Sequence, residues 1–242
     1  MNNNIKLSNR LLTAVSYLPN GANFADIGSD HAYLPCYVCL SDPTAKAIAG
    51  EVNKGPYESA KATIHKYHLD ERVEVRLGDG LEVLQDNEVN QIVIAGMGGS
   101  LIKTILENGK SKLSRVERII AQPNVDARNV RRWFYENDYI LTHEAILDEN
   151  DHIYEVLVAN KVSDSNPYSK EFMEKELLFG PFLLKKKSTV FKEKWTLEHQ
   201  KLDRVIAQMR NASKPDYAKI ELFEKELAWM EEVVKDEKQH PE

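Results

Sequence analysis

The sequence contains little cysteine. Among its 242 residues only Cys36 and Cys39 are cysteines, and they form a single C-x-x-C pair. A redox pair or half of a zinc site is one interpretation, but no second cysteine pair and no histidine at zinc-finger spacing completes a four-ligand site. The surrounding apolar run, residues 34–40, favours a buried helix in which cysteine is a small hydrophobic residue. We therefore expect no metal site.

Long apolar runs are also missing. No stretch approaches the ~18–20 uninterrupted apolar residues that a membrane-spanning helix needs, so we expect no membrane partner. Residues 1–6 lack the apolar segment of a secretion signal, and we therefore expect a cytoplasmic protein. At 42% hydrophobic residues, the chain has enough apolar side chains for a substantial core.

The third deficit is positive charge. The formal net charge is −6. Residues 163–242 hold 15 Lys and Arg against 16 Asp and Glu, which leaves 17 against 22 for residues 1–162. The overall basic field that is usual for nucleic-acid-binding proteins is therefore absent, and any contact with RNA must use local basic patches.

What the sequence does contain is an alternation of short apolar runs and helical stretches. Strands are expected at 22–27, 45–51, 73–77, 91–95 and 118–121, with helices at about 32–40, 56–68, 101–106 and 126–137. This alternation predicts a parallel sheet with helices on both faces, the Rossmann-like α/β class. Residues 139–148 and 153–160, joined by a polar turn, predict a hairpin that adds an antiparallel strand at the end of the sheet.

The last third of the chain has a helical period only. Residues 161–169 are polar and predict a linker, so we expect domains at 1–162 and 163–242. Heptad-spaced apolar residues from Leu184 to Met209 and from Ile220 to Val234 flank the turn 211–215. They predict an antiparallel helical hairpin, or coiled coil, with its seam over residues 182–236.

The first chemical motif follows the first strand, where Asp26-Ile-Gly-Ser-Asp30 occurs. In open parallel sheets, ligands bind outside the carboxyl ends of the strands. A dinucleotide-binding turn would read G-x-G-x-x-G, but here only Gly28 is present and acidic residues surround it. An acidic turn is poor for an anion and suits a cation such as S-adenosylmethionine, which carries an ammonium and a sulfonium. A simple strand-end turn is the alternative.

Acidic residues also end the next two strands. Glu51 closes the second strand, where a carboxylate can accept both hydroxyl protons of a ribose. Asp79, followed by Gly80, comes after the third strand and can accept the exocyclic amine of an adenine while a nearby backbone amide meets a ring nitrogen. Taken one at a time, each has a simpler interpretation: Glu51 as an exposed glutamate at a strand end, and Asp79 as part of an Asp-Gly turn. Three acidic groups at three successive strand ends together favour a methyltransferase cofactor site.

Glycines dominate the end of the fourth strand, in Ala95-Gly96-Met97-Gly98-Gly99. They allow backbone to approach a planar ring or the methionine moiety closely, although a tight strand-to-helix turn explains them equally. An N/D-P-P-Y segment, used by many enzymes that methylate exocyclic amines, is absent. Its absence favours a ring nitrogen as the methyl acceptor.

Gln122 and Asn124 follow the fifth strand. Side-chain amides at this position can contact the edge of a flipped-out base. The arginines that come next, Arg128, Arg131 and Arg132, can contact phosphate, or can simply form a solvated helix face.

Taken together, these segments resemble one bacterial family. The resemblance rests on residues 26–35 (DIGSDHAYLP), Gly50-Glu51, Gly78-Asp79-Gly80, Gly96-Met-Gly-Gly99 and Gln122-Pro-Asn124. The sequence is similar to the tRNA (adenine-22-N1)-methyltransferases over essentially its whole length. The resemblance implies a class I methyltransferase with a C-terminal coiled-coil domain, which methylates ring nitrogen 1 of an adenine in the D-arm region of tRNA.

Candidate residues for the chemistry lie in the first loop. A carboxylate near the methylated, cationic base would stabilise its charge, and Asp30 is the first candidate, with His31 beside it. Asp30 can instead bind the methionine ammonium, and His31 can be a packed or turn-capping residue. Tyr33 can stack on a base, although an aromatic residue at the start of a helix is more often core.

The expected partner is tRNA. Lys185, Lys186 and Lys187 are candidate phosphate contacts, and a solvated helix face is the alternative. The antiparallel hairpin can satisfy its own seam, so we expect a monomer. Two rival functions stay open: a methyltransferase of a protein or small molecule that dimerises through the hairpin, and a non-catalytic RNA-binding module.

Overall fold

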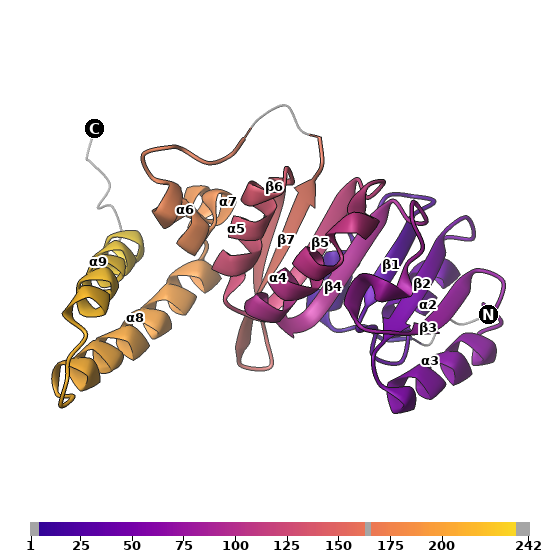
Figure 1. The fold of residues 1–242 in the computed structure, drawn as a ribbon, viewed down its shortest axis with the longest axis horizontal. Helices are drawn as coiled ribbons and strands as arrows, with labels where there is room; N and C mark the ends of the chain where they lie inside the picture. The colour runs from indigo at the N-terminus through magenta and orange to yellow at the C-terminus, as the bar shows by residue number, and fades with distance from the viewer. Residues whose placement is uncertain (1–4, 163–165, 236–242) are drawn as a thin grey trace. The chain divides into compact units, whose positions relative to one another are not determined.

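The structure, a computed structural model, describes residues 5–162 and 166–235. The chain divides into two compact units, Met1–Pro167 and Tyr168–Glu242 (Figure 1). The boundary expected between residues 162 and 163 falls at the edge of residues 163–165, which lie outside the described residues.

The first unit is built on a seven-stranded sheet of order β3-β2-β1-β4-β5-β7-β6. Its strands are β1 (Asn23–Ile27), β2 (Lys46–Glu51), β3 (Val73–Leu77), β4 (Gln91–Gly98), β5 (Arg118–Val125), β6 (Ile140–Glu149) and β7 (His152–Asn160). The first five are parallel, and β7 is antiparallel to both β5 and β6. The predicted α/β class and the terminal hairpin are confirmed. The hairpin folds back, so that its second strand lies inside the sheet and its first strand forms the edge.

Helices cover both faces of this sheet. They are α1 (Asn9–Val15), α2 (Tyr33–Ser41), α3 (Lys54–Lys66), α4 (Gly99–Asn108) and α5 (Ala127–Glu136), with the 3-10 turns η1 (Gly80–Val83) and η2 (Lys110–Leu113). Residues of α1, α2 and α3 share one core cluster with the strand residues that face them. The helices α4 and α5 pack on each other and on β4 and β5 (Figure 1).

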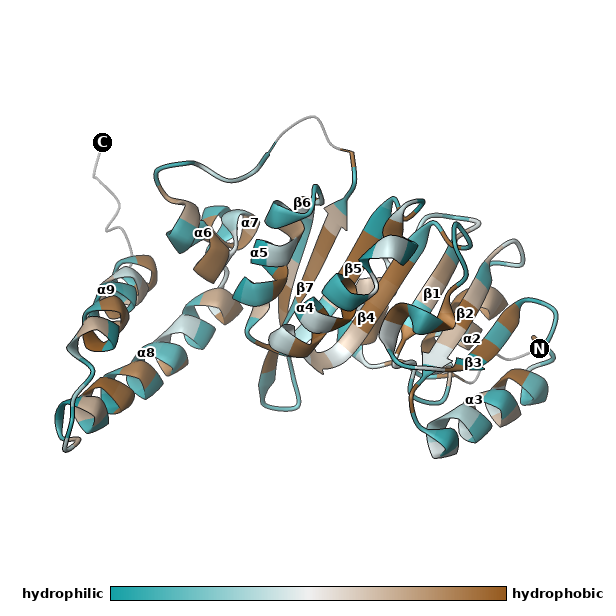
Figure 2. Cartoon of the chain, in the orientation of Figure 1, coloured by the Kyte–Doolittle hydropathy of each residue, from teal (hydrophilic) through white to brown (hydrophobic). Residues whose placement is uncertain are grey.

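The central strands are apolar along their length because both faces of the sheet are covered, as the brown strands of Figure 2 show. Cys36 and Cys39 lie buried in α2 as free thiols, which confirms the expected buried helix. Burial raises the pKa of Cys36 to about 12 and that of Cys39 to about 11. Both thiols therefore stay protonated at neutral pH and behave as small apolar side chains.

One arginine of α5 lies in the interior rather than on a surface. The Arg131 side chain is fully buried, donates to Glu144 Oε1 at 2.6 Å and pairs with Glu155. Both sequence interpretations of Arg131, a phosphate contact and a solvated helix face, are therefore wrong. The buried carboxylates on the adjacent hairpin strands require a buried cation, and a sequence pattern cannot reveal that pairing.

The second unit is helical. It comprises α6 (Met173–Phe179), α7 (Pro181–Lys186), α8 (Thr189–Arg210) and α9 (Tyr217–Val234). The helices α8 and α9 pack on each other, which confirms the predicted hairpin. An aromatic cluster connects α6 with the start of α8: the ring centroids of Phe179 and Trp195 lie 4.4 Å apart, with Phe191 beside them.

The seam of the hairpin differs from the prediction at its start and in its phase. Lys187 takes a left-handed conformation (φ 41°) and Ser188 accepts a hydrogen bond from the Phe191 backbone, so α7 ends and α8 begins there. The lysines at 185–187 therefore precede the hairpin instead of belonging to it. Heptad spacing predicts Val205 in the seam, but Val205 is exposed and its neighbour Ile206 is buried instead. The reason is that the 3.6-residue helical period drifts away from strict heptad spacing.

Candidate active site

A cavity of about 470 Å³ opens at the carboxyl ends of β1 and β4. This is the edge where open parallel sheets bind ligands. The loop after β1, the start of α2, the end of β4 and an N-terminal segment form its wall. The lining residues are Lys6, Leu7, Ser8, Arg10, Leu11, Asp26, Gly28, Ser29, Asp30, Tyr33, Leu34, Ala95, Gly96 and Met97.

The loop after β1 is strained and tightly held. Three consecutive residues that are not glycine, Asp30, His31 and Ala32, have φ values of 47°, 68° and 58°. Left-handed conformations of this kind cost on the order of 1–3 kcal/mol each and persist only where the surroundings enforce them. The backbone amides of Gly28 and Ser29 both donate to the Gly50 carbonyl, at 2.9 and 3.2 Å. These bonds fix the loop to the end of β2.

Gly28 lies where the loop meets β4. Its φ is 71°, and a Cβ atom placed there would lie 2.2 Å from Met97 Cε. The positive φ favours glycine at this position, and the flexible end of the Met97 side chain packs directly over it.

Asp26 is the most deeply buried acid of the cavity. Its side chain is 3% exposed and accepts a 2.6 Å hydrogen bond from Ser29 Oγ. Burial raises its pKa to about 7, the Ser29 hydroxyl opposes that rise, and the charges of Glu51 and Asp30 add to it. A cationic ligand in the cavity would favour the ionised form of Asp26.

Glu51 is the last residue of β2, as predicted, and it is buried. Its Oε1 has no hydrogen-bond partner among residues 5–162 and 166–235. Burial raises the Glu51 pKa, while the backbone N–H groups of Asp30 and His31 act in the opposite direction. A buried carboxylate oxygen without a donor costs folding free energy, so this atom fits a ligand that brings its own hydroxyl donors.

Asp79 and Gly80 follow β3, next along the same sheet edge. Asp79 is exposed and precedes η1, and Gly80 has φ 54°. Neither these two residues nor Glu51 and Gly98 line the cavity between β1 and β4. The structure thus places the predicted cofactor residues in sequence along one edge, with Asp26, Gly28, Asp30, Gly96 and Met97 around the cavity.

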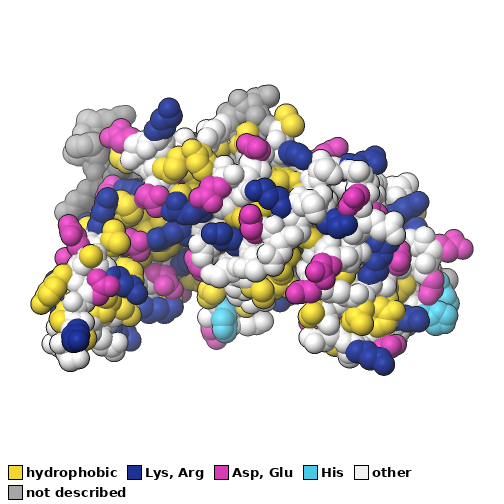
Figure 3. Space-filling model, in the orientation of Figure 1, with side chains coloured by type: hydrophobic (Ala, Val, Ile, Leu, Met, Phe, Trp, Pro, Cys, Tyr) yellow, Lys and Arg dark blue, Asp and Glu magenta, His cyan; other side chains and the backbone are white. Residues whose placement is uncertain are grey.

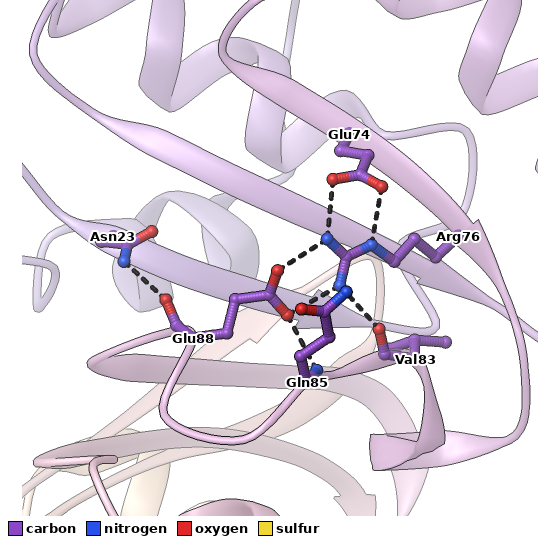
Figure 4. Close-up of polar contacts among 6 residues, drawn as sticks. All are labelled: Asn23, Glu74, Arg76, Val83, Gln85 and Glu88. Atoms are coloured by element: carbon purple, nitrogen blue, oxygen red, sulfur yellow. Dashed lines mark hydrogen bonds and ion pairs between the residues drawn. The ribbon is translucent and has the colours of Figure 1, made fainter.

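A polar cluster anchors the loop that carries Asp79 (Figure 4). Arg76 donates to both oxygens of Glu74 and of Glu88 and to the Val83 carbonyl at 2.9 Å. Asn23 of β1 donates to the Glu88 carbonyl at 2.8 Å. The Arg76 guanidinium lowers the pKa of Glu74 and of Glu88. The cluster therefore ties the loop after β3 to both β3 and β1.

The end of β4 is irregular, with register shifts against β5 on both sides of Met97. Gly96 has φ 80° and is held from both of its backbone groups: its N–H donates to Gln122 Oε1 at 3.1 Å and its carbonyl accepts from Asn124 Nδ2 at 2.8 Å. The side-chain amides of Gln122 and Asn124 on β5 therefore fix the backbone of the glycine segment at the end of β4.

Gln122 does not present its amide to the cavity as the sequence suggested. The side chain is fully buried and its amide atoms bond Arg10, Gly96 and Asn124. The expectation that Gln122 contacts a base is corrected: in this geometry it can only position its neighbours. Asn124 is exposed beside Gly96, so its side chain can still contact a base.

His31 and Tyr33 lie beside Asp30 at the entrance. His31 Nε2 is 3.4 Å from Asp30 Oδ1, and the rings of His31 and Tyr33 are 5.5 Å apart. Tyr33 is 45% exposed and lines the cavity, so it is not a core aromatic residue. The arrangement leaves an aromatic face and a carboxylate open to a substrate.

The N-terminal segment was missed by the sequence interpretation. Residues 6–11 and helix α1 complete the cavity wall, and Arg10 reaches Gln122 Oε1 at 2.5 Å. Spacing of apolar residues at Leu11 and Val15 is the one signal that indicates this helix. The helix has only seven residues, too few for a clear period.

The remaining candidates are basic. Arg128 is half-buried at the start of α5, while Lys185 and Lys186 are exposed in the second unit and Lys187 is half-buried. On the face shown in Figure 3, basic and acidic side chains are interspersed. No large basic patch is visible on this face, and the expectation that RNA contacts use local basic patches stays a prediction.

No group of three or more His, Cys, Asp or Glu side chains suited to a metal ion occurs among residues 5–162 and 166–235. Within the same described ranges, none of the helices combines the length and apolar character needed to cross a membrane.

The sheet order, the acidic strand ends and the cavity above β1 and β4 define a class I S-adenosylmethionine-dependent methyltransferase. Residues 24–232 match the family model of the tRNA (adenine(22)-N(1))-methyltransferases. The chain belongs to the tRNA (adenine(22)-N(1))-methyltransferase family.

Individual relatives agree with this membership. The tRNA (adenine(22)-N(1))-methyltransferase of Bacillus subtilis is 47% identical over 234 residues, 97% of this chain and 98% of the relative. The crystal structure of the B. subtilis M1A22 tRNA methyltransferase TrmK superposes with a TM-score of 0.90 at 44% identity, covering 96% of this chain and 100% of that chain. Streptococcus pneumoniae Sp1610, in complex with S-adenosyl-L-methionine, gives 0.83 at 36% identity over 95% and 100%.

The buried Asp26 generates a prediction about stability. Its pKa in the folded protein, about 7, is higher than the ordinary aspartate value of 3.8. The contribution of protonated Asp26 to the free energy of unfolding is therefore complete below about pH 4. It is lost as the pH rises to about 7, because ionising the buried acid costs free energy. Asp26→Asn removes this cost, so the variant should gain stability over the wild type across that range, by on the order of 2–4 kcal/mol.

Urea unfolding of the ligand-free protein between pH 5 and pH 8 measures this difference. Asp79→Asn is the matched control, because Asp79 is exposed, and it should follow the wild-type pH dependence. A constant difference between Asp26→Asn and the wild type at all pH values would show that Asp26 ionises normally.

Proposed function

We propose that the protein transfers a methyl group from S-adenosylmethionine to ring nitrogen 1 of adenine 22 in tRNA. The observation that carries this proposal is the pair of buried acids at the ends of β1 and β2. One of them has an oxygen that lacks any donor in the part of the chain that the structure describes. Family membership supplies the nucleotide and the ring position. The substrate implies that the enzyme acts in the cytoplasm, and we propose that it does so as a monomer.

In this proposal the loop after β1 holds the amino-acid end of the cofactor. Asp26 and Asp30 provide negative charge toward the ammonium and the sulfonium, and the missing side chain of Gly28 lets the ligand approach the backbone. Asp26 is buried, where Coulomb attraction is less screened than at the surface.

The ends of β2 and β3 hold the nucleoside end. Glu51 accepts hydrogen bonds from the two ribose hydroxyls, which would supply the donors that its Oε1 lacks. Asp79 accepts from the adenine amine, and the backbone at Gly80 lies beside it. We assign Gly96, Met97 and Gly98 of β4 to the opposite side of the cofactor, and the first two of them line the cavity.

The cofactor, when bound, supplies an electrophilic methyl group whose departing sulfur keeps the electrons of the broken bond. Nitrogen 1 of adenine offers a lone pair, so no base has to remove a proton before the new bond forms. Positioning therefore supplies much of the rate. The methylated base is cationic, and the exposed Asp30 carboxylate at the entrance can stabilise it and accept a proton from its amine. His31 lies within 3.4 Å of Asp30 and orients it.

The base must leave the helix stack, because nitrogen 1 takes part in Watson–Crick pairing. We propose that the exposed ring of Tyr33 stacks on the flipped base and that Asn124 contacts its edge. Arg128 and the lysines 185–187 contact phosphates, so that residues 1–162 carry the chemistry and residues 163–242 contribute RNA contacts.

The direct test of this function is methyl transfer from labelled cofactor to a tRNA transcript with adenine at position 22. A transcript with guanine at that position should accept no label, since its nitrogen 1 carries a proton. Equal labelling of both transcripts would reject position 22, and labelling of protein or small-molecule pools alone would favour a different methyltransferase.

The Glu51 assignment predicts a loss of cofactor affinity. Glu51→Ala removes a charged acceptor of two ribose hydroxyls, and hydrogen bonds to charged groups contribute roughly 1.5–3 kcal/mol each. Calorimetry should therefore show at least about tenfold weaker binding of S-adenosylmethionine. The exposed Glu58→Ala is the control and should bind normally. Unchanged affinity in folded Glu51→Ala would remove Glu51 from the site.

Asp30 has two candidate roles that Asp30→Asn separates. If its charge stabilises the cationic product, turnover should fall by at least about tenfold while cofactor affinity changes by less than about threefold. Parallel losses of turnover and affinity would assign Asp30 to cofactor binding. Normal values of both would eliminate it from the site.

The three lysines predict a salt-dependent contact. Replacing Lys185, Lys186 and Lys187 with glutamine should weaken tRNA binding and flatten the dependence of log Kd on log salt, because fewer counterions are released. Cofactor affinity should stay unchanged. A control triple variant at the exposed Lys46, Lys61 and Lys66 has the same charge change and should keep the wild-type slope. Identical titrations of both triple variants would redirect the search to Arg128.

A further inference from the structure

The guanidinium of Arg10 is a polar group in the cavity wall that the cofactor assignments do not use. It comes from α1, lines the cavity and donates to Gln122 Oε1 at 2.5 Å. Gln122 in turn donates from Nε2 to Asn124 Oδ1 at 3.2 Å, and Asn124 donates from Nδ2 to the Gly96 carbonyl at 2.8 Å. The three side chains form a chain of hydrogen bonds that ends at the edge of β5.

The direction of this chain follows from its donors. A guanidinium only donates hydrogen bonds, and so does the Gly96 backbone N–H, which is 3.1 Å from the same Gln122 oxygen. Gln122 must therefore turn its carbonyl oxygen toward Arg10 and its NH₂ group toward Asn124. The Asn124 oxygen then faces Gln122, and its NH₂ group faces the Gly96 carbonyl. An amide otherwise exchanges oxygen and nitrogen by a simple flip. The charged Arg10 donor, at 2.5 Å the shorter of the two bonds to the Gln122 oxygen, opposes that flip together with the backbone groups of Gly96.

Arg10 is itself held firmly. Its Cζ lies 5.4 Å from the centre of the Tyr154 ring, in cation–π geometry. The Glu149 carboxylate accepts from the backbone of Asn9 at 2.6 Å and of Arg10 at 3.4 Å. The hairpin strands β6 and β7 thus fix the start of α1 and direct the Arg10 side chain toward Gln122.

Asn124 is the exposed end of this hydrogen-bond network and bonds Gly96, which lines the cavity. Its oxygen has two lone pairs and uses one of them for Gln122. The edge of adenine presents the exocyclic NH₂ donor directly beside nitrogen 1. We propose that Arg10 is a positioning residue that, through Gln122, holds the Asn124 oxygen as the acceptor for the exocyclic amine of the target adenine. This inference rests on the proposed function.

The test compares two transcripts, one with adenine and one with unsubstituted purine at position 22. Purine keeps nitrogen 1 but lacks the exocyclic amine. That amine also makes nitrogen 1 of adenine more nucleophilic, so each variant is compared with the preference of the wild type, which shares this intrinsic difference. The wild-type enzyme should prefer adenine by at least about tenfold in kcat/KM, since the purine leaves the Asn124 acceptor unpaired. Arg10→Gln loses the charged donor and can accept as well as donate, so it holds the Gln122 amide less firmly, and its preference should fall at least about threefold below that of the wild type. Arg10→Lys only donates and should keep the wild-type preference.

A second variant alters the same series of hydrogen bonds without changing Arg10. Gln122→Glu keeps an acceptor for Arg10 but has no donor for Asn124, so it should also lose the preference for adenine. Thermal unfolding and cofactor affinity of each variant control for folding. A wild-type adenine preference in both Arg10→Gln and Gln122→Glu would overturn the proposal, as would a wild-type enzyme that uses both transcripts equally. Failure of the wild type to methylate either transcript would instead reject the proposed function, and the inference with it.

Discussion

Buried negative charge that forms no ion pair among the described residues is the constraint on which the site depends. Asp26 and Glu51 lie at the ends of adjacent strands with Asp30 beside them, and burial raises the pKa of both buried acids. A fold selected for stability alone would pair or remove these groups, as it pairs Glu144 and Glu155 with Arg131 elsewhere in the same unit. The unpaired acids lower the stability of the ligand-free protein, and a cationic ligand with hydroxyl donors compensates for that cost.

The parallel sheet is what brings these groups together. β1, β2 and β3 are neighbours in register, so residues that are about 25 positions apart in sequence meet at one edge. Backbone bonds from the loop after β1 to Gly50, and the Arg76 cluster on the loop after β3, then hold that edge in place. Rigid neighbours are also what permits the left-handed run at Asp30 to Ala32.

The sequence predicted the features that arise from local pattern. Strand β3 has the predicted bounds, the acidic residues fall at strand ends, and the hairpins of β6–β7 and α8–α9 form as expected. Features that depend on long-range pairing were not predictable in this way. Arg131 is buried because two glutamates on the hairpin that follows α5 need a cation. Gln122 is buried because Arg10, more than 100 residues earlier, approaches it, and the short helix that carries Arg10 leaves almost no periodic signal.

Proton release on cofactor binding tests the central constraint most directly. A bound cation should drive Asp26, with its pKa of about 7, toward its ionised form. Calorimetric titrations with S-adenosylmethionine at pH 6.5, in buffers of different ionisation enthalpy, measure the protons exchanged. At that pH an α-amino group, with a pKa of about 7.7–8.0, is already protonated and contributes little. The account predicts net proton release that Asp26→Asn abolishes. Binding of normal affinity with no proton release in the wild type would contradict it.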